Sequence, residues 1–407
     1  MSVPGLFKFV LTLRSKWAII SAEIAEINQG KLRSNRRDFM LKYIYQHGEY
    51  PHFTWDEKRI LDLLTSTAAL QGRLLGKMQQ LGFGAQQEVM LNALTEEITK
   101  SNKIEGEILD SAQVRSSIAG KLDINLSKKA VPSHRINCVV ECMLDAIRNF
   151  NKPLTKARLF GWHAALFPSG YSGMNKIRTA RFRNGEMQVV SVKSNRETVL
   201  YEAPSFGEVP KQMLSFLNWL NKAGNENPLL KAAIAHLWFV IIHPFDDGNG
   251  RLTRIITEML LARAENTPLR FYSMSSQIQK EKKEYYHILE CTTTSSPDIT
   301  GWLEWFFNCL DRSIGASEMI AGNVLKKAVF WQKNSIAVTN SIQQAIINRL
   351  FDGFEGNLTS GKTAKMYKVS QDTAGRLLKD LMDKNILEIK GGGRSTHYVL
   401  KNCYLSG

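Results

Sequence analysis

Apolar residues recur at helical spacing along most of this chain, and that periodicity constrains the fold more than any other feature. A long example runs from Trp55 to Leu81 and ends before Gly82, with apolar positions at Ile60, Leu63, Leu64, Ala68 and Leu75. Further helices are expected near residues 89–98, 133–149, 155–166, 209–221, 229–242, 252–264, 279–291 and 299–314. We therefore predict a mainly α protein.

Two segments depart from the helical pattern. Residues 186–191 and 198–202 are rich in apolar and β-branched side chains, and the stretch 193–197 between them has turn composition. They predict a β-hairpin, the one clear hairpin expected in the first 330 residues.

The last 70 residues change pattern again. Helices are expected over 342–351, 359–367 and 373–384, the third capped by Ser370, followed by strands at 386–389 and 398–400 around the glycines 391–393. Three helices followed by a β-ribbon is the order of a winged helix, a variant of the helix-turn-helix.

The charge and cysteine content narrow the class of protein. With 53 basic and 38 acidic residues, the formal charge is 53 − 38 = +15, which favours polyanionic partners such as nucleotides, nucleic acid or acidic lipid headgroups. The odd, scattered set of 5 cysteines indicates a reducing compartment, and we expect a cytoplasmic protein. No apolar run is long enough to span a bilayer.

The spacing of one histidine and two cysteines has two interpretations, a metal site and a half-buried helix face. His134, Cys138 and Cys142 fall at i, i+4 and i+8, so they share a helix face that can hold a metal ion. A half-buried helix face explains the same spacing, and we favour it because structural zinc takes four close ligands.

The segment that carries chemistry is His243-Pro-Phe-Asp-Asp-Gly-Asn-Gly-Arg-Leu-Thr-Arg254, which joins two expected helices. Its Gly248-Asn249-Gly250 run lets backbone N–H groups converge at a helix start, and Asn249 can cap that helix. Arg251 and Arg254 lie in the first turn, where cations oppose the helix dipole unless an anion binds there.

Two further residues of this segment complete a reaction site. Asp247 offers a hard oxygen ligand that suits Mg²⁺ together with substrate phosphates. His243 can take a proton from a hydroxyl. Together these parts indicate phosphoryl or nucleotidyl transfer, and the residues alone leave open which phosphate is attacked.

The segment resembles the signature of the Fic family, His-x-Phe-x-Asp/Glu-Gly-Asn-Gly-Arg-x-x-Arg, at every fixed position, and the similarity extends from about Phe53 to Leu310. The resemblance implies a protein adenylyltransferase that moves AMP from ATP to a Ser, Thr or Tyr hydroxyl. It assigns His243 as the base, Asp247 as the Mg²⁺ ligand and Phe245 as a structural anchor. The ATP-binding residues that it implies are Gly248, Asn249, Gly250, Arg251, Leu252, Thr253, Arg254, Tyr285 and Tyr286.

A second motif resembles the inhibitory motif of the family, Ser/Thr-x-x-x-Glu-Gly/Asn. It reads Ser101-Asn-Lys-Ile-Glu105-Gly106, and the resemblance implies that Glu105 pairs with Arg254 and slows transfer. The expected hairpin resembles the family's flap, on which a target segment can dock along residues 187–202.

These interpretations predict how the chain is divided into domains. Residues 1–39 form an extension of uncertain role. Gly5 to Ile20 can also be interpreted as a basic amphipathic helix on a membrane surface, a weaker alternative, and a third alternative is that translation begins at Met40. Residues 40–140 form a helical region with the inhibitory motif, 141–315 the Fic core and 335–407 the winged helix.

Several alternatives stay open. A winged helix with Arg376, Lys379, Lys390 and Arg394 suits a DNA-binding regulator with a Fic sensor, although Asp372, Asp380 and Asp383 dilute its basic face. The same scaffold can also remove AMP or transfer phosphate or phosphocholine. Self-modification and homo-oligomers are further possibilities.

Overall fold

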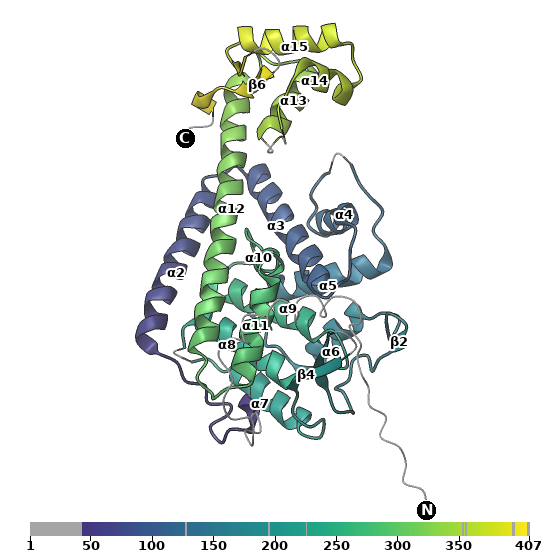
Figure 1. The fold of residues 1–407 in the computed structure, drawn as a ribbon, viewed down its shortest axis with the longest axis vertical. Coiled ribbons are helices and arrows are strands. Elements are labelled where there is room, and N and C mark those ends of the chain that lie inside the picture. The colour runs from purple at the N-terminus through teal and green to yellow at the C-terminus, as the bar shows by residue number, and fades with distance from the viewer. Residues whose placement is uncertain are drawn as a thin grey trace, which may run out of the picture. The chain divides into compact units, whose positions relative to one another are not determined.

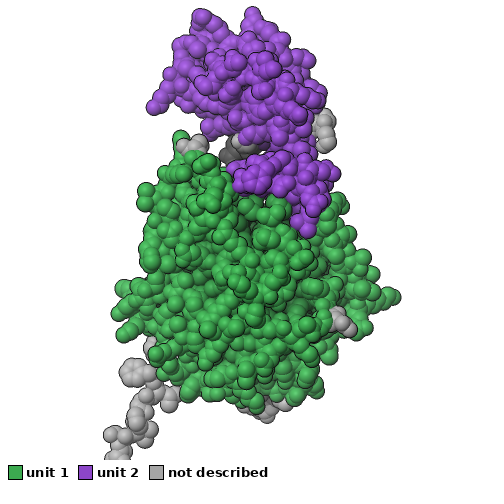
Figure 2. Space-filling model, turned by 180° about the vertical axis from the view of Figure 1, so that it is seen from behind, with its two compact units in different colours: residues 1–73, 90–315 green, residues 74–89, 316–407 purple. Residues whose placement is uncertain are grey.

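The computed structural model describes residues 43–404 apart from 127, 194–195, 225, 352–353, 355 and 393–394, and it leaves undescribed the side chains of 190–198, 321 and 402. The expected extension 1–39 lies outside the described residues, as does Arg394. The chain divides into two compact units (Figure 2). Unit 1 contains the described residues up to Arg73 and Met90–Gly315, and unit 2 contains Leu74–Val89 and Ala316–Gly407.

Two buried helices form the centre of unit 1. Helix α8 (Pro228–Ile242) packs along α9 (Asn249–Glu265), and both are buried over most of their length. A helix that is apolar on every side, as α8 is, must be enclosed by other elements. Around this pair, α7 (Val209–Asn221) packs on α8, α5 (His134–Arg148) contacts α9 and α6 (Lys156–Leu166), and α4 (Ser111–Lys121) covers α5 (Figure 1).

Side-chain caps explain where several of these helices begin. Asp110, Ser133, Thr155 and Asn227 each accept a hydrogen bond from a backbone N–H of the first turn of α4, α5, α6 and α8. Such caps satisfy amides that have no partner within the helix.

The remaining helical elements surround the centre or continue into unit 2. They are η1 (Ile44–Gln46), α2 (Glu57–Gln79), α3 (Phe83–Ile104), α10 (Met274–Lys280), α11 (Lys282–Thr293) and α12 (Thr300–Asn334). Buried Glu97 fixes α3 within unit 1, since it accepts hydrogen bonds from the Ser273 hydroxyl at 2.8 Å and the Ser275 amide at 2.9 Å. These contacts hold the end of α3, where Glu105 follows.

Two expected helix boundaries are wrong. The helix expected to end at Ile314 continues as α12 to Asn334, because Gly315 lowers helix propensity without breaking the hydrogen-bond ladder as proline does. The helix expected over 279–291 is instead divided at Glu281 into α10 and α11.

The strands are antiparallel pairs. β3 (Gln188–Lys193) pairs with β4 (Arg196–Glu202), with a register shift between Val189 and Val190. The expectation of a single hairpin before residue 330 is wrong, because β1 (Tyr171–Ser172) and β2 (Asn175–Lys176) form another. Strands of two residues are too short to show alternation, and their turn uses Gly173 at φ 57°.

Unit 2 has its own core. Helices α13 (Ser341–Phe351), α14 (Ser360–Tyr367) and α15 (Gln371–Asp383) precede β5 (Leu387–Lys390), β6 (His397–Leu400) and η3 (Asn402–Tyr404), in the order that the sequence predicts. The Ser370 hydroxyl caps α15 by accepting from the Thr373 amide at 3.1 Å. The core includes Ile346, Ile347, Leu378, Leu381, Leu387 and Leu400.

Other sequence features are placed as follows. All 5 cysteines are free thiols. His134 Nε2 lies 3.6 Å from Cys138 Sγ on α5, and burial raises the pKa of Cys142 to about 12. In the described ranges, no three His, Cys, Asp or Glu side chains are grouped as a metal site, and none of the helices has the length and hydropathy of a transmembrane segment.

A buried ion pair beyond α9 gives a test of the packing. Arg270 is fully buried, and its Nε donates to Glu258 Oε2 at 2.8 Å. Arg270→Met leaves that carboxylate without its partner and should lower the free energy of unfolding by about 3–5 kcal/mol, measured by urea denaturation. Arg59→Met removes the exposed pair with Glu304 and should cost about 0–1 kcal/mol. Equal effects would contradict this view of the core.

Candidate active site

The loop between α8 and α9 has an unusual backbone at both ends. His243 ends α8 in the left-handed region at φ 49°, which few residues other than glycine adopt. Gly248 precedes α9 at φ 82°, and a Cβ there would lie 2.7 Å from the Phe167 ring. The sequence therefore needs glycine at position 248 for both conformation and space.

Asn249 closes the loop rather than capping α9, so the expected cap is wrong. Its Oδ1 accepts from the Phe245 amide at 3.0 Å, and its Nδ2 donates to the Phe245 carbonyl at 2.8 Å. Gly248 is the N-cap residue, and the first turn of α9 has no side-chain cap. The amides at this helix start thus remain available to a ligand.

Phe245 lies in the core beneath the loop. Its ring is fully buried and stacks on the His163 imidazole at 4.2 Å between centroids. His163 Nδ1 accepts from the Ala180 amide at 3.0 Å, so the ring proton is on Nε2, which donates to the Asp247 carbonyl at 3.2 Å. Burial lowers the pKa of His163 to about 4, which keeps this imidazole neutral.

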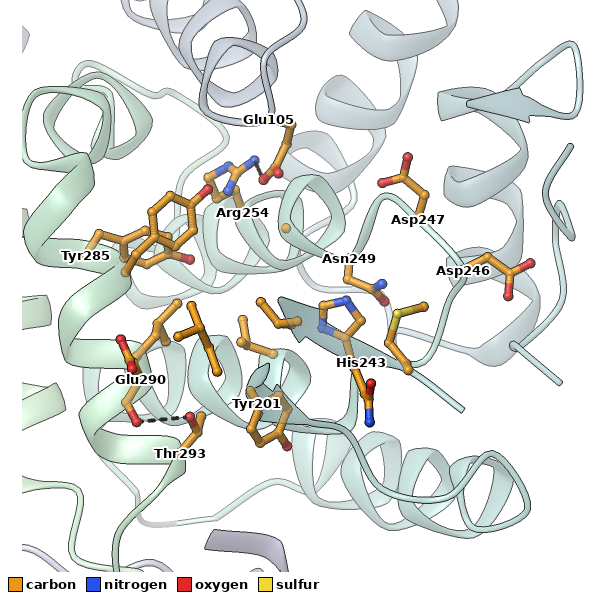
Figure 3. Close-up of a pocket in the computed structure, with 18 residues that line it drawn as sticks. Glu105, Tyr201, His243, Asp246, Asp247, Asn249, Arg254, Tyr285, Glu290 and Thr293 are labelled. Atoms are coloured by element: carbon orange, nitrogen blue, oxygen red, sulfur yellow. Dashed lines mark hydrogen bonds and ion pairs between the residues drawn. The ribbon is translucent and has the colours of Figure 1, made fainter. Parts of the chain in front are cut away.

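The loop opens onto a pocket that collects residues from distant segments (Figure 3). The start of α9 forms one wall with Asn249, Gly250 and Arg254, and His243, Asp246 and Asp247 lie beside it. Glu105, which follows α3, and Val240 of α8 also line it. The hairpin and α11 supply the rest of the lining: Met187, Gln188, Val189, Leu200, Tyr201, Tyr285, Tyr286, Leu289, Glu290 and Thr293.

Arg254 is held by the motif at the end of α3. Its Nη2 donates to Glu105 Oε1 at 2.7 Å, and its Nε donates to the Ser101 hydroxyl at 2.8 Å. Burial opposes the charge of Arg254, but the Glu105 carboxylate outweighs that effect and raises the pKa of the guanidinium. Gly106 follows at φ 88°, which turns the chain after Glu105. A Cβ at Gly250 would lie 2.2 Å from Glu105 Oε1, so Gly250 makes room for this carboxylate.

Arg251 is held in the same way by a carboxylate that the sequence did not predict. Its Nη1 donates to Glu107 Oε2 at 2.9 Å, and its guanidinium lies 4.6 Å from the Phe167 ring centre. Glu107 also pairs with Arg135 of α5 at 2.5 Å. The side chain of Arg251 is 3% exposed, so this cation is almost removed from solvent. The position of Glu107, two residues after Glu105, is the only signal that the sequence offers.

Asp247 carries the carboxylate beside the helix start. Its Oδ2 accepts from the Ser172 hydroxyl of β1, its Oδ1 accepts from the Gly248 amide, and Arg251 Nη2 lies 3.8 Å away. One carboxylate together with substrate phosphates is a donor set that suits Mg²⁺. Asp247 therefore fits the metal ligand that was expected, with Ser172 orienting it.

His243 lines the pocket between Asp247 and the hairpin. Burial, and then the positive charge of Arg183, lower the pKa of His243 to about 4, although Asp247 and Glu105 oppose this. The imidazole is therefore neutral near pH 7 and able to accept a proton. Tyr201 of β4 fixes the hairpin here, because its hydroxyl donates to the Ile241 carbonyl at 2.7 Å.

The two tyrosines of α11 differ in their surroundings. The Tyr285 hydroxyl lies 2.9 Å from His236 Nε2, and the residue is 2% exposed. Tyr286 is half-buried, and its ring lies 5.2 Å from that of Tyr285. Both line the pocket.

Four expected ATP-binding residues are not among those that line the pocket, namely Gly248, Arg251, Leu252 and Thr253. Leu252 and Thr253 are fully buried, and the Thr253 hydroxyl donates to the Asn249 carbonyl at 2.8 Å. Their side chains lie in the core at the first turn of α9.

The electrostatics of His243 predict its protonation state. Because its pKa is lowered in the folded protein, the ring should stay neutral down to about pH 5, where an ordinary histidine is charged. The free energy of unfolding should decrease as the pH is lowered from about 6.5 to about 4, because the unfolded chain binds the proton at a higher pH than the folded chain does. Histidine-ring NMR, with His243→Ala to assign the signal, measures this. A midpoint above 6 would contradict it.

Comparisons with known proteins agree with this geometry. A family model described as Fic/DOC family matches residues 153–261, and another, described as a domain of unknown function (DUF4172), matches residues 43–124. Protein adenylyltransferase Fic from Aedes aegypti is 26% identical over 229 residues, which are 54% of this chain and 41% of that protein. The protein of the same name from Drosophila grimshawi is 31% identical over 113 residues, 27% of this chain and 22% of that protein.

The chain thus spans less than half of the length of these curated relatives. Among solved structures, a Fic family protein from Desulfovibrio desulfuricans is 22% identical, with a TM-score of 0.49, 84% of this chain covered and 96% of that chain. Fic-1 from C. elegans is 20% identical, with a TM-score of 0.45, 63% of this chain covered and 71% of that chain. Residues 153–261, from α6 through most of α9, therefore form a Fic domain of the Fic/DOC family.

Proposed function

We propose that this chain is a protein adenylyltransferase, which moves AMP from ATP to a hydroxyl of a target protein. The observation that carries the proposal is the start of α9. There an uncapped helix N-terminus, the buried Arg254, a carboxylate and a neutral imidazole border one pocket. A second buried arginine, Arg251, lies in the same first turn of α9 but outside the lining of the pocket. The names of the curated relatives support the same activity.

The chemistry follows from these groups. Amides of the α9 start and the guanidiniums of Arg251 and Arg254 bind the phosphates of ATP. His243 accepts the proton of the target hydroxyl, whose oxygen forms a bond to the α-phosphorus while the bond to the β-phosphate oxygen breaks. AMP-protein and pyrophosphate result. Mg²⁺, held by Asp247, would neutralise phosphate charge when bound.

The target would dock on the β3–β4 hairpin. The sheet has only these two strands in the described residues, so each strand has one edge without a strand partner. An added strand beside residues 187–202 would lie next to His243, because Met187, Gln188 and Val189 line the same pocket.

We propose that the conformation with Glu105 on Arg254 is inhibited. The carboxylate lies against Gly250, where phosphate would contact the helix start, and it neutralises the cation that phosphate would use. Glu107 adds a second carboxylate on Arg251. Both carboxylates must move before a triphosphate binds both arginines, since like charges at this distance repel.

Further properties stay predictions. These are the removal of AMP, self-modification, a homo-oligomer and a cytoplasmic location. For the winged helix, Arg376 pairs with Asp372, and Lys384 pairs with Asp380 at 2.5 Å, so part of the charge on α15 is already neutralised. DNA binding through this unit is therefore the weaker candidate.

Labelling with α-labelled ATP and Mg²⁺ tests the proposed function. Glu105→Gly should self-label about 10- to 100-fold faster than the wild type, because an inhibitory coupling of this kind is worth 1–3 kcal/mol. Glu105→Gln should behave similarly, since it also removes the charge. Glu105→Gly with His243→Ala should show no label. Absence of ATP binding in every form would rule out the enzyme.

Glu107 provides a separate prediction. In the Glu105→Gly chain, Glu107→Gln should tighten ATP binding about fivefold, because Arg251 then lacks a competing carboxylate. Isothermal titration with ATP and Mg²⁺ measures the affinity. Glu141→Gln, which removes the surface pair with Lys121, is the matched control and should change nothing. An unchanged or weaker affinity in Glu107→Gln would show that Glu107 does not compete with phosphate.

A further inference from the structure

Arg183 is a buried cation whose acceptors are backbone carbonyls. The residue is 3% exposed, and its Nε donates to the His243 carbonyl at 2.9 Å. Its Nη1 donates to the Gly185 carbonyl at 2.9 Å, and its Nη2 donates to the Pro204 carbonyl. Within the described residues, no carboxylate is paired with it. Its role is therefore not that of one half of an ion pair.

The three acceptors belong to the two parts of the site that must be aligned. His243 holds its left-handed conformation at the end of α8, a strained geometry that persists only where neighbouring groups fix it. The backbone amide of Arg183 adds a contact by donating to the Pro244 carbonyl at 2.9 Å. Arg183 thus holds the backbone on both sides of the His243–Pro244 bond.

The other two acceptors frame the hairpin. Gly185 lies shortly before β3 begins at Gln188, and Pro204 shortly after β4 ends at Glu202. The Ala203 amide, which donates to the Met187 carbonyl at 2.9 Å, closes the hairpin between them. A single guanidinium therefore joins both ends of the hairpin to the residue that would act as the base.

We propose that Arg183 is a positioning residue, which sets the His243 imidazole relative to a target chain docked on the hairpin. This inference rests on the proposed function, and it assigns Arg183 to the step in which the target hydroxyl loses its proton rather than to ATP binding. Arg183 is not among the described residues that line the pocket, and its three side-chain hydrogen bonds go to the carbonyls of His243, Gly185 and Pro204 rather than to α9.

The chemistry of the side chain explains why arginine occupies this position. Its planar fork offers five N–H donors in fixed directions, whereas lysine offers one ammonium on a flexible stem. Lysine can reach one or two of the three carbonyls but cannot hold all of them in one plane. The positive charge also acts on the base, since after burial it is the next contribution that lowers the pKa of His243.

The test compares Arg183→Lys and Arg183→Gln in the Glu105→Gly chain. The self-labelling rate at saturating ATP should fall about tenfold for lysine and about 100-fold for glutamine, as expected when a reacting group is misplaced by about 1 Å. The Kd for ATP, measured by isothermal titration, should stay within about twofold. Arg263→Lys is the matched control, because Arg263 is another part-buried arginine that donates to a carbonyl, that of Phe150 at 3.0 Å.

A second readout does not depend on activity. Histidine-ring NMR of the same variants should show that Arg183→Gln shifts the signal of His243 and raises the pKa of this residue. The signal of His236 should not move in Arg183→Gln, and the signal of His243 should not move in the Arg263→Lys control. If the Glu105→Gly chain fails to label, the adenylyltransferase proposal is in doubt but the NMR result still decides the role of Arg183. An unmoved His243 signal, or an ATP affinity that falls as much as the rate, would overturn the inference.

Discussion

The reciprocal hydrogen bonds between Asn249 and the backbone of Phe245 are the interaction on which the site depends. They close the loop between two buried helices, and the Phe245 ring beneath them is enclosed by the core. With the loop closed, the imidazole of His243 and the amides at the start of α9 face the same pocket. Because Asn249 is used in this way, the helix start has no side-chain cap and can receive an anion.

The charges at that helix start link the proposed inhibited state to the proposed active state. Arg251 and Arg254 are buried cations at the positive end of a helix, and such charges need counterions. The end of α3 supplies Glu107 and Glu105 as those counterions. A triphosphate would meet the same need, so we infer that the carboxylates and the nucleotide are alternative partners of the same two arginines.

The surroundings of the loop show how the fold supports this arrangement. Glu97 anchors α3 through Ser273 and Ser275, which keeps Glu105 and Glu107 within reach of α9. His163 holds the Asp247 carbonyl from α6, and Arg183 holds the His243 carbonyl from the segment before the hairpin. Except for the bond between the Ser273 and Glu97 side chains, each support is a hydrogen bond between a side chain and the backbone, so its geometry does not depend on exposed, flexible groups.

The sequence by itself determined what depends on local spacing. It predicted the helical pattern, the hairpin over 186–202, the Ser370 cap, the segment 243–254 and the motif that contains Glu105, because periodicity and capping act over a few residues. It predicted the wrong end for α12, because a glycine weakens a helix without ending it, and a capping role for Asn249, whose side chain instead bonds to the backbone of Phe245. Only the tertiary structure decided the partners of the site. Glu107 lies 144 residues from Arg251, Ser172 lies 75 from Asp247 and Arg183 lies 60 from His243, and contacts at such separations depend on how helices pack.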